Sequence, residues 1–237
     1  MIIILSPSKT FNKNPIKTKT TNLSDKTFFL FNILSSYDTN ELVNTLNISK
    51  KLSDEVYGYY KNFKNEYYAV YLYGGTAFKY LDAFNIPNSN LKNLYFLSAF
   101  YGLINSFDAI SKYRLDLKDK IIDQSLENYW FEDINSKLIN LKANTIINLS
   151  SGEYSRLLDL NNNKITTINF GIKVNNKITS SSMMLKKMRG LMANHLLKHN
   201  INSIEEIKKV TIAGFKYSND ESTNKLLMFI KEDKLWN

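Results

Sequence analysis

Short apolar runs alternate with helical patterns along this chain, and this alternation restricts the fold more than any other feature. The clearest runs predict buried strands at 2–5 (IIIL), 69–73 (AVYLY), 94–98 (LYFLS) and 145–149 (TIINL). Weaker strand patterns cover 165–170, 211–217 and 226–231. Helical patterns lie between them, at about 24–36, 40–47, 50–63, 76–84, 126–141 and 182–199.

The order of these elements predicts a mixed α/β (α+β) fold with a central mixed sheet flanked by helices, because strands and helices interleave without regular βαβ spacing. The chain has 237 residues, three prolines and eight glycines, with no repeat of solenoid period and no Pro/Gly/Ser-rich linker. A chain of this length buries roughly 70% of its unfolded surface. We therefore expect one domain over residues 1–237.

The absence of cysteine excludes several classes of function. Disulfides, thiol redox catalysis, cysteine-ligated iron–sulfur clusters and c-type haem attachment all need that residue. The start MIIILSPSKT has no basic region before its apolar run and is too short for a signal peptide. No apolar stretch approaches the ~20 residues of a membrane span. We expect a cytoplasmic protein with no membrane contact.

The positive charge is concentrated in two segments. The net charge is +9, yet residues 1–24 contribute +4 and residues 160–204 contribute +7, with no acidic residue in either. The rest of the chain is therefore slightly acidic. Such clustering is typical of a basic surface that meets nucleic acid, although solvated lysines of a lysine-rich chain explain it as well.

The segment LSPSKT (5–10) follows the first predicted strand and places Lys9 in a loop at the strand end. Loops at strand ends often carry functional groups. Lys9 could bind phosphate or, if desolvated, act as a nucleophile. An exposed lysine in a turn is the simpler explanation.

Arginine is rare in this chain, with Arg114, Arg156 and Arg189 against many lysines. If KYRLDL (112–117) is extended, Arg114 and Asp116 project from one face and can form an ion pair. A surface pair contributes little to stability. The planar guanidinium can also hold a carboxylate or phosphate through two hydrogen bonds, which lysine cannot do.

The stretch NLSSGEYSRLL (148–158) ends a strand and begins a helix that contains Glu153 and Tyr154. Small polar residues at such a start could offer free amides to an anion. Ser151 as an ordinary N-cap explains the same residues.

The helical pattern at 182–199 carries Lys186, Lys187 and Arg189, and Lys186 and Arg189 share a face because they are three residues apart. Gly190 in mid-helix costs ~1 kcal/mol relative to alanine and indicates that another backbone passes close by. His195 and His199 are four apart, but two histidines without a third ligand are weak grounds for a metal, and we expect none.

Residues 44–63 predict a helix, a tight turn and a second helix capped by Ser49, with Lys50 and Lys51 in its first turn. The helix dipole disfavours cations there, and a bound phosphate would relieve that conflict. A helix–hairpin–helix-like element binds the DNA backbone in this manner, although its usual glycine-rich hairpin is absent.

Five ordered motifs resemble the YaaA peroxide stress resistance protein family: SPSKT, LSAFYGLINSFDAISKYRLDL, NYW, NLSSGEY and LKKMRGLM. The resemblance runs from Leu5 to about Phe229. The family pattern has glutamate where this chain has Asp116, and it differs mildly at Ser8, Ala99, Ser106 and Met188.

The resemblance implies a single α/β domain in a cytosolic protein that helps cells survive hydrogen peroxide. It also implies lower free intracellular iron and DNA binding through a basic cleft. The family's polar set corresponds to Lys9, Ser98, Tyr101, Asp108, Tyr113, Arg114, Glu153, Tyr154, Lys186 and Arg189. We expect these side chains to converge in space.

Three functions compete. The first is a DNA-binding protein with little sequence preference, whose phosphate contacts would be Lys9, Lys50, Lys51, Arg114, Lys186, Lys187 and Arg189. The second is an enzyme acting on DNA or a small phosphorylated molecule, with catalytic candidates Lys9, Tyr113, Arg114 and Glu153, although no catalytic motif matches. Direct iron sequestration comes last because its ligands are too few. We expect no cofactor.

Overall fold

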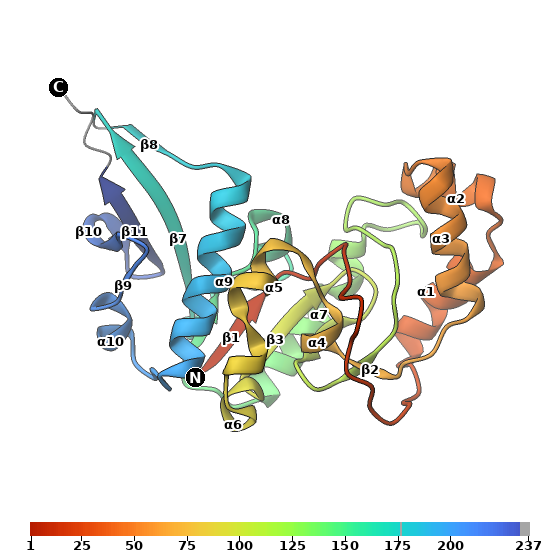
Figure 1. Cartoon of the computed structure of the whole chain (residues 1–237), viewed down its shortest axis with the longest axis horizontal. Coiled ribbons are helices and arrows are strands. Elements are labelled where there is room, and N and C mark those ends of the chain that lie inside the picture. Colours follow the sequence, from red (N-terminus) through yellow and green to blue (C-terminus); the bar gives the residue numbers. More distant parts are fainter. Residues whose placement is uncertain (176, 233–237) are drawn as a thin grey trace.

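The computed structural model describes residues 1–175 and 177–232. A nine-stranded sheet runs through the molecule in the order β4-β3-β1-β6-β7-β11-β10-β9, with β8 paired to β7 (Figure 1). The strands are β1 (Ile2–Leu5), β3 (Leu94–Ser98), β4 (Gly102–Asn105), β6 (Ile146–Asn148), β7 (Ile165–Val174), β8 (Lys177–Thr179), β9 (Thr211–Ile212), β10 (Phe215–Thr223) and β11 (Leu226–Glu232). A separate pair joins β2 (Tyr67–Tyr68) to β5 (Ala109–Ile110).

The sheet is mixed, as the sequence predicts. β1 lies between β3 and β6 and is parallel to both, and the parallel pairing continues through β7 to β11. β4, β8, β9 and β10 add antiparallel pairs. All four residues of β1 are buried, because a central parallel strand is covered on both faces.

The helices are α1 (Asp25–Ser36), α2 (Thr39–Leu46), α3 (Lys50–Lys61), α4 (Ala69–Leu72), α5 (Gly75–Leu81), α6 (Asn88–Leu91), α7 (Leu126–Asn140), α8 (Gly152–Ser155), α9 (Ser182–Lys198) and α10 (Ile204–Lys208), with a 3₁₀ turn at Ala83–Asn85. All six predicted helices are present within a few residues of their expected bounds. No helix in the described part of the chain is long and apolar enough to cross a membrane.

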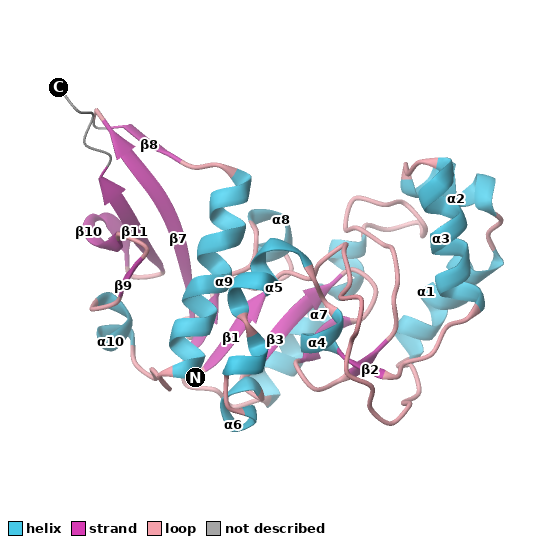
Figure 2. Cartoon of the chain, viewed as in Figure 1, coloured by secondary structure: helices cyan, strands magenta, loops and turns pink. Residues whose placement is uncertain are grey.

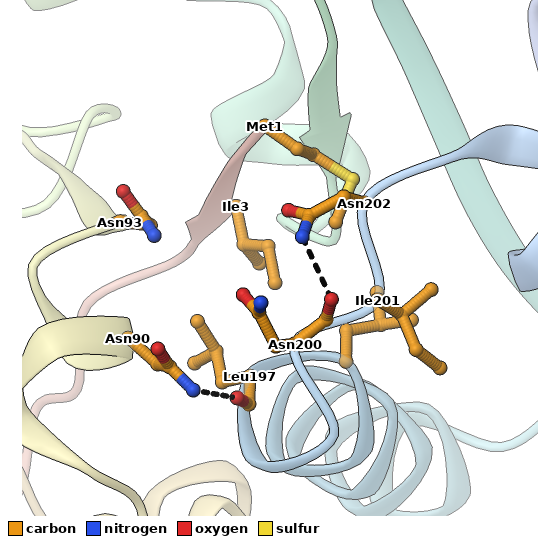
Figure 3. A pocket seen from close by; sticks show the side chains of 9 residues that line it. Met1, Ile3, Asn90, Asn93, Leu197, Asn200, Ile201 and Asn202 are labelled. Atoms are coloured by element: carbon orange, nitrogen blue, oxygen red, sulfur yellow. Dashed lines mark hydrogen bonds between the residues drawn. The ribbon is translucent and has the colours of Figure 1, made fainter.

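Two helices cover opposite faces of the sheet. Leu196 and Leu197 of α9 line a small cavity with Met1 and Ile3 at the start of β1 (Figure 3). Leu138 of α7 lines a second hollow with Ile146, whose register partner is Ile2. Neighbouring residues of a strand point to opposite faces, so α9 packs on the Ile3 face and α7 on the Ile2 face.

Two strand predictions are wrong in part. Ala69–Leu72 form the single helical turn α4 instead of a strand, and Tyr73 makes only an isolated bridge to Phe11. The first amides of α4 bond to the loop before β5 (Val70 N to Ser106 O, 3.0 Å). A short apolar run reports burial, and periodicity alone cannot distinguish a buried strand from a buried helical turn. The run 211–217 is two strands, because Ala213 and Gly214 adopt positive φ (51° and 84°) and reverse the chain.

Helices α1 to α3 lie together at one end of the long axis, away from α9 (Figure 1). The turn between α2 and α3 has Asn47 in the left-handed conformation (φ 48°) and Ser49 as N-cap, accepting from Leu52 N. The predicted helix, turn and helix are thus confirmed. Figure 2 shows long irregular segments after β1 and before α7, and both enter the site described next.

Candidate functional site

The polar residues of the sequence motifs gather where the central strands end. Ser6 follows β1, Ser98 closes β3 and Ser150 follows β6. Because these strands are parallel, their carboxyl ends meet at one edge of the sheet. β1 has β3 on one side and β6 on the other, so the chain departs in opposite directions on either side of it. In α/β sheets, ligands bind at such a switch point.

An ion pair joins the loop after β1 to the segment before α7. Lys9 Nζ lies 2.5 Å from Asp116 Oδ2, and Arg114 Nη2 lies 4.0 Å from the same oxygen. The Asp116 side chain is 6% exposed, whereas that of Lys9 is 53% exposed. Two cations therefore converge on one buried carboxylate, and Lys9 brings the cluster to the surface. The predicted ion pair between Arg114 and Asp116 is present, and Lys9 lies closer to Asp116 than Arg114 does.

Asp119 adds a second carboxyl group beside Asp116. Its Oδ2 accepts from the Asp116 amide at 2.7 Å, and its own amide donates to the Asp116 carbonyl at 3.0 Å. Burial, together with the nearby Asp116 charge, raises the pKa of Asp119 to about 6. This carboxyl group is therefore poised to exchange a proton near neutral pH.

A buried chain of hydrogen-bonded hydroxyl groups supports the segment that carries the ion cluster. Tyr113 Oη bonds Tyr73 Oη and Ser98 Oγ, each at 2.8 Å, and Ser98 Oγ accepts from the amides of Phe100 and Tyr101 at 3.1 Å. Burial raises the pKa of Tyr113 to about 12. The hydroxyl groups are thus neutral at physiological pH, and they fix the end of β3 against the segment that carries Arg114.

The Arg114 backbone is held by α3. Tyr60 Oη donates to the Arg114 carbonyl at 2.8 Å and accepts from its amide at 3.2 Å. One buried hydroxyl group thus satisfies both backbone groups of Arg114, which lies outside regular secondary structure. Arginine at this position therefore belongs to a built ion cluster.

The end of β6 completes the site. Ser151 N donates to Ser6 Oγ at 2.8 Å, which fastens the loop after β6 to the loop after β1. Tyr154 is 7% exposed, and the carboxylates of Asp116 and Asp119 contribute, after burial, to raising its pKa. Glu153 is exposed, and no described residue forms an ion pair with it.

Two members of the expected polar set form hydrogen bonds to neighbouring segments of the fold. Tyr101 donates to Asn65 Oδ1 at 2.7 Å and accepts from the Ser111 amide at 2.9 Å. Asp108 Oδ2 accepts from the Asn105 amide at 2.8 Å and closes the turn after β4. Tyr101 thus joins the segment before Tyr113 to the one that follows α3, and Asp108 fixes the turn between β4 and β5.

The helix α9 packs on α5, and among the described residues no hydrogen bond or ion pair joins its cations to the ion cluster. Lys186 is exposed, and Lys187 Nζ lies 5.1 Å from the centre of the Tyr80 ring. A Cβ on Gly190 would collide with the Ala77 carbonyl oxygen of α5, which confirms the predicted close approach of another backbone. Two residues earlier, α5 begins at Gly75 against the Ser8 and Thr10 side chains. The first turn of α5 therefore touches both α9 and the Lys9 loop.

Lys50 and Lys51 lie in α3, at the end of the molecule away from α9 (Figure 1). Of the basic residues in the polar set expected to converge, Lys9 and Arg114 meet at Asp116, and no ion pair or hydrogen bond joins Lys186 or Arg189 to them among the described residues. His195 and His199 have ring centres 4.5 Å apart. Among the described residues, no group of three or more potential ligands could hold a metal.

Ion pairs neutralise some of the lysines of the two basic segments. In the N-terminal segment, Lys9 pairs with Asp116 and Lys17 pairs with Glu66 at 2.8 Å. In the second segment Lys173 pairs with Glu221 at 3.1 Å. No other cation of residues 160–204 has a carboxylate partner among the described residues. The excess positive charge is thus centred on α9 and the strands before it.

Sequence reasoning missed Asp119 and Tyr73. Asp119 stands three residues after Asp116, a spacing at which an aspartate side chain can close a turn onto the backbone. That spacing was available in the sequence as a signal. Tyr73 offered no such signal, because it ends an apolar run that is typical of the hydrophobic core.

Known proteins are similar to this chain over almost its whole length. A family model described as "Peroxide stress protein YaaA" matches residues 1–221. A UPF0246 protein of Fusobacterium nucleatum is 34% identical over 98% of this chain and 100% of its own length. A UPF0246 protein of Francisella tularensis subsp. tularensis is 31% identical over the same shares of both chains. The motifs, the fold and the matches lead to one conclusion: this chain belongs to the peroxide stress protein YaaA family.

Proposed function

We propose that the protein acts in peroxide stress in the cytosol by binding the DNA backbone, and that it helps to limit free iron and oxidative DNA damage. One observation carries the DNA proposal. The first turn of α3 holds Lys50 and Lys51 and no acidic residue. The positive end of the helix dipole lies at that turn, so the lysines are unfavourable there until an anion binds.

The two lysines are not equivalent. Lys50 Nζ donates to Thr39 Oγ1 and to Asn40 Oδ1 (3.2 Å), and it lies 3.9 Å from Asp54 Oδ1. Lys51 is exposed, and no ion pair to it is found among the described residues. Lys51 is therefore the more available phosphate contact, and Lys50 braces the two helices.

The surface of α9 supports the proposal as a second basic area. Lys186 is exposed. Within residues 160–204 only Lys173 has a carboxylate partner in the described part of the chain, so Lys186 has none. Long lysine side chains contact phosphates and carry no information on base sequence. The expected binding is therefore tight at low salt and only weakly sequence-specific.

The test is the salt dependence of binding to a fluorescent duplex. Lys51→Glu should weaken binding and lower the slope of log K against log salt by about 1, the loss of one phosphate contact. Lys216→Glu on β10, also exposed, is the charge-matched control and should have a smaller effect. Equal losses for the two variants, or binding that is flat between low and moderate salt, would contradict the proposal.

The role in iron needs a cellular measurement. A strain lacking the protein should contain more chelatable iron after peroxide treatment than a complemented strain. Complementation with Lys51→Glu then shows whether DNA contact is required for that effect.

The ion cluster favours a second candidate, an enzyme acting on DNA or on a phosphorylated molecule. A buried carboxylate with two cations, next to a carboxyl group of raised pKa, is more than phosphate binding requires. Lys9 would be the nucleophile in a lyase acting on an abasic sugar. Borohydride should then trap wild type on abasic DNA and should not trap Lys9→Ala. No adduct with wild type would exclude the lyase.

A further inference from the structure

The three arginines of the chain differ in their partners. Arg114 meets Asp116, and Arg156 Nε lies 3.5 Å from Glu127 Oε2. Arg189 has no carboxylate partner and no hydrogen bond among the described residues. Its Nε is moreover buried from solvent. A guanidinium that is partly buried and unpaired is unusual, because arginine is rarely buried without a partner.

The neighbours of Arg189 in the described part of the chain offer no carboxylate. Met188 and Met192 on either side are 1% and 0% exposed, and Gly190 is pressed against α5. No acidic residue occurs between 160 and 204. Burial lowers the pKa of Arg189, and no carboxylate opposes that effect. The fold therefore holds a desolvated positive charge without a counter-ion of its own.

We propose that Arg189 anchors a binding site for the phosphate group of a small phosphorylated ligand on α9. The guanidinium fork suits a phosphate through paired hydrogen bonds. Lys186 lies one turn earlier on the same side of the helix and is exposed, so it supplies a second charge at the entrance. Lys187 stacks on Tyr80 instead and serves the packing of α9 on α5.

A small ligand fits Arg189 better than a duplex does. The Nε is out of solvent contact, and a DNA backbone lying on the surface contacts exposed side chains such as Lys51 and Lys186 first. We expect a phosphate monoester to pair with the guanidinium, with Lys186 one turn earlier as the second charge. Arg189 itself is not among the proposed DNA contacts Lys51 and Lys186, so an Arg189 variant tests this site without removing either of them.

The experiment measures the melting temperature and calorimetric binding of the full chain with inorganic phosphate and with adenosine 5′-monophosphate, against potassium chloride of equal ionic strength. We expect both phosphates to raise the Tm of wild type. Arg189→Met should abolish that rise and weaken binding at least tenfold. Arg189→Lys keeps the charge, loses the fork and should also bind more weakly.

Two further readouts separate a ligand site from a structural role. Without ligand, Arg189→Met should melt at or above the wild-type temperature, because replacing an unpaired buried charge by an apolar side chain of similar length removes a desolvation cost. Arg156→Met, which removes the exposed arginine paired with Glu127, is the matched control and should keep the phosphate response. Duplex binding by Arg189→Met should stay within twofold of wild type.

Several results would overturn the proposal. One is that neither phosphate raises the Tm of wild type, and another is that Arg189→Met keeps the wild-type rise in Tm. A third is that ligand-free Arg189→Met melts well below ligand-free Arg156→Met. Loss of duplex binding in Arg189→Met with an intact phosphate response would instead assign the guanidinium to DNA.

Discussion

At the scale of single residues, Asp119 is a carboxyl group whose pKa is set by its surroundings. It is 7% exposed, accepts from the Asp116 amide and lies near the Asp116 charge. Burial and that neighbouring charge favour its protonated form, whereas the amide hydrogen bond favours the ionised form. The first two effects prevail, and the pKa rises from 3.8 to about 6.

This raised pKa predicts a specific pH dependence of stability. Between about pH 4 and pH 6 the folded chain binds the Asp119 proton and the unfolded chain does not, so stability falls as the pH rises through that window. The full shift corresponds to roughly 3 kcal/mol as an upper limit. Asp119→Asn keeps an oxygen acceptor and removes the titration.

Urea unfolding of wild type and Asp119→Asn at pH 4.5 and pH 7 checks the prediction. Relative to wild type, the variant should gain stability on going from pH 4.5 to pH 7. An identical pH dependence in the two proteins would show that Asp119 titrates normally in the folded state.

At the scale of elements, the contact between α5 and α9 depends on the absence of a Cβ atom at Gly190. Gly190 allows the Ala77 carbonyl to approach the helix, and a Cβ there would collide with backbone that cannot swing away. Gly58 in α3 is the opposite case, with no atom within 4 Å of a Cβ built on it. The same substitution should therefore have opposite effects in the two helices.

Gly190→Ala should lower the free energy of unfolding by about 1–2 kcal/mol, because the overpacking cost exceeds the gain in helix propensity. Gly58→Ala should raise it by about 0.5–1 kcal/mol through propensity alone. Chemical denaturation of both variants tests the pair. Stabilisation by both alanines would mean that α5 and α9 separate easily.

At the scale of the whole molecule, the question is whether α1 to α3 unfold with the sheet. Tyr60 of α3 holds the Arg114 backbone, and the Phe63 and Phe100 rings lie 5.9 Å apart between their centroids. Lys26 Nζ of α1 donates to the Tyr129 carbonyl of α7 at 2.8 Å. These contacts tie the three helices to the segments around β3 and to α7.

We therefore expect one cooperative unfolding transition. In a Trp236→Phe background, fluorescence of the buried Trp130, whose Nε1 donates to the Ala99 carbonyl at 2.8 Å, reports on the central body. Far-ultraviolet circular dichroism reports on all helices. Coincident curves are the expected result. An earlier helical transition would show that α1 to α3 form a separate unit and that the single-domain expectation is wrong.

The sequence by itself determined the type of most elements and the family. IIIL, LYFLS and TIINL are strands and the six helical patterns are helices, because the period of the apolar residues decides which face a segment can bury. The Ser49 cap and the close approach at Gly190 were also predictable, since each depends on local backbone requirements.

Only the tertiary structure decided which charges meet. Lys9 and Asp116 are 107 positions apart, and long-range contacts bring them together, among them the pairing of β1 with β3 and the bond of Ser98 at the end of β3 to Tyr113. In the described part of the chain the same folding left Arg189 without a carboxylate partner and placed α3 far from α9. A charge in a sequence has no partner until long-range contacts supply one, so ion pairs, burial and pKa belong to the fold.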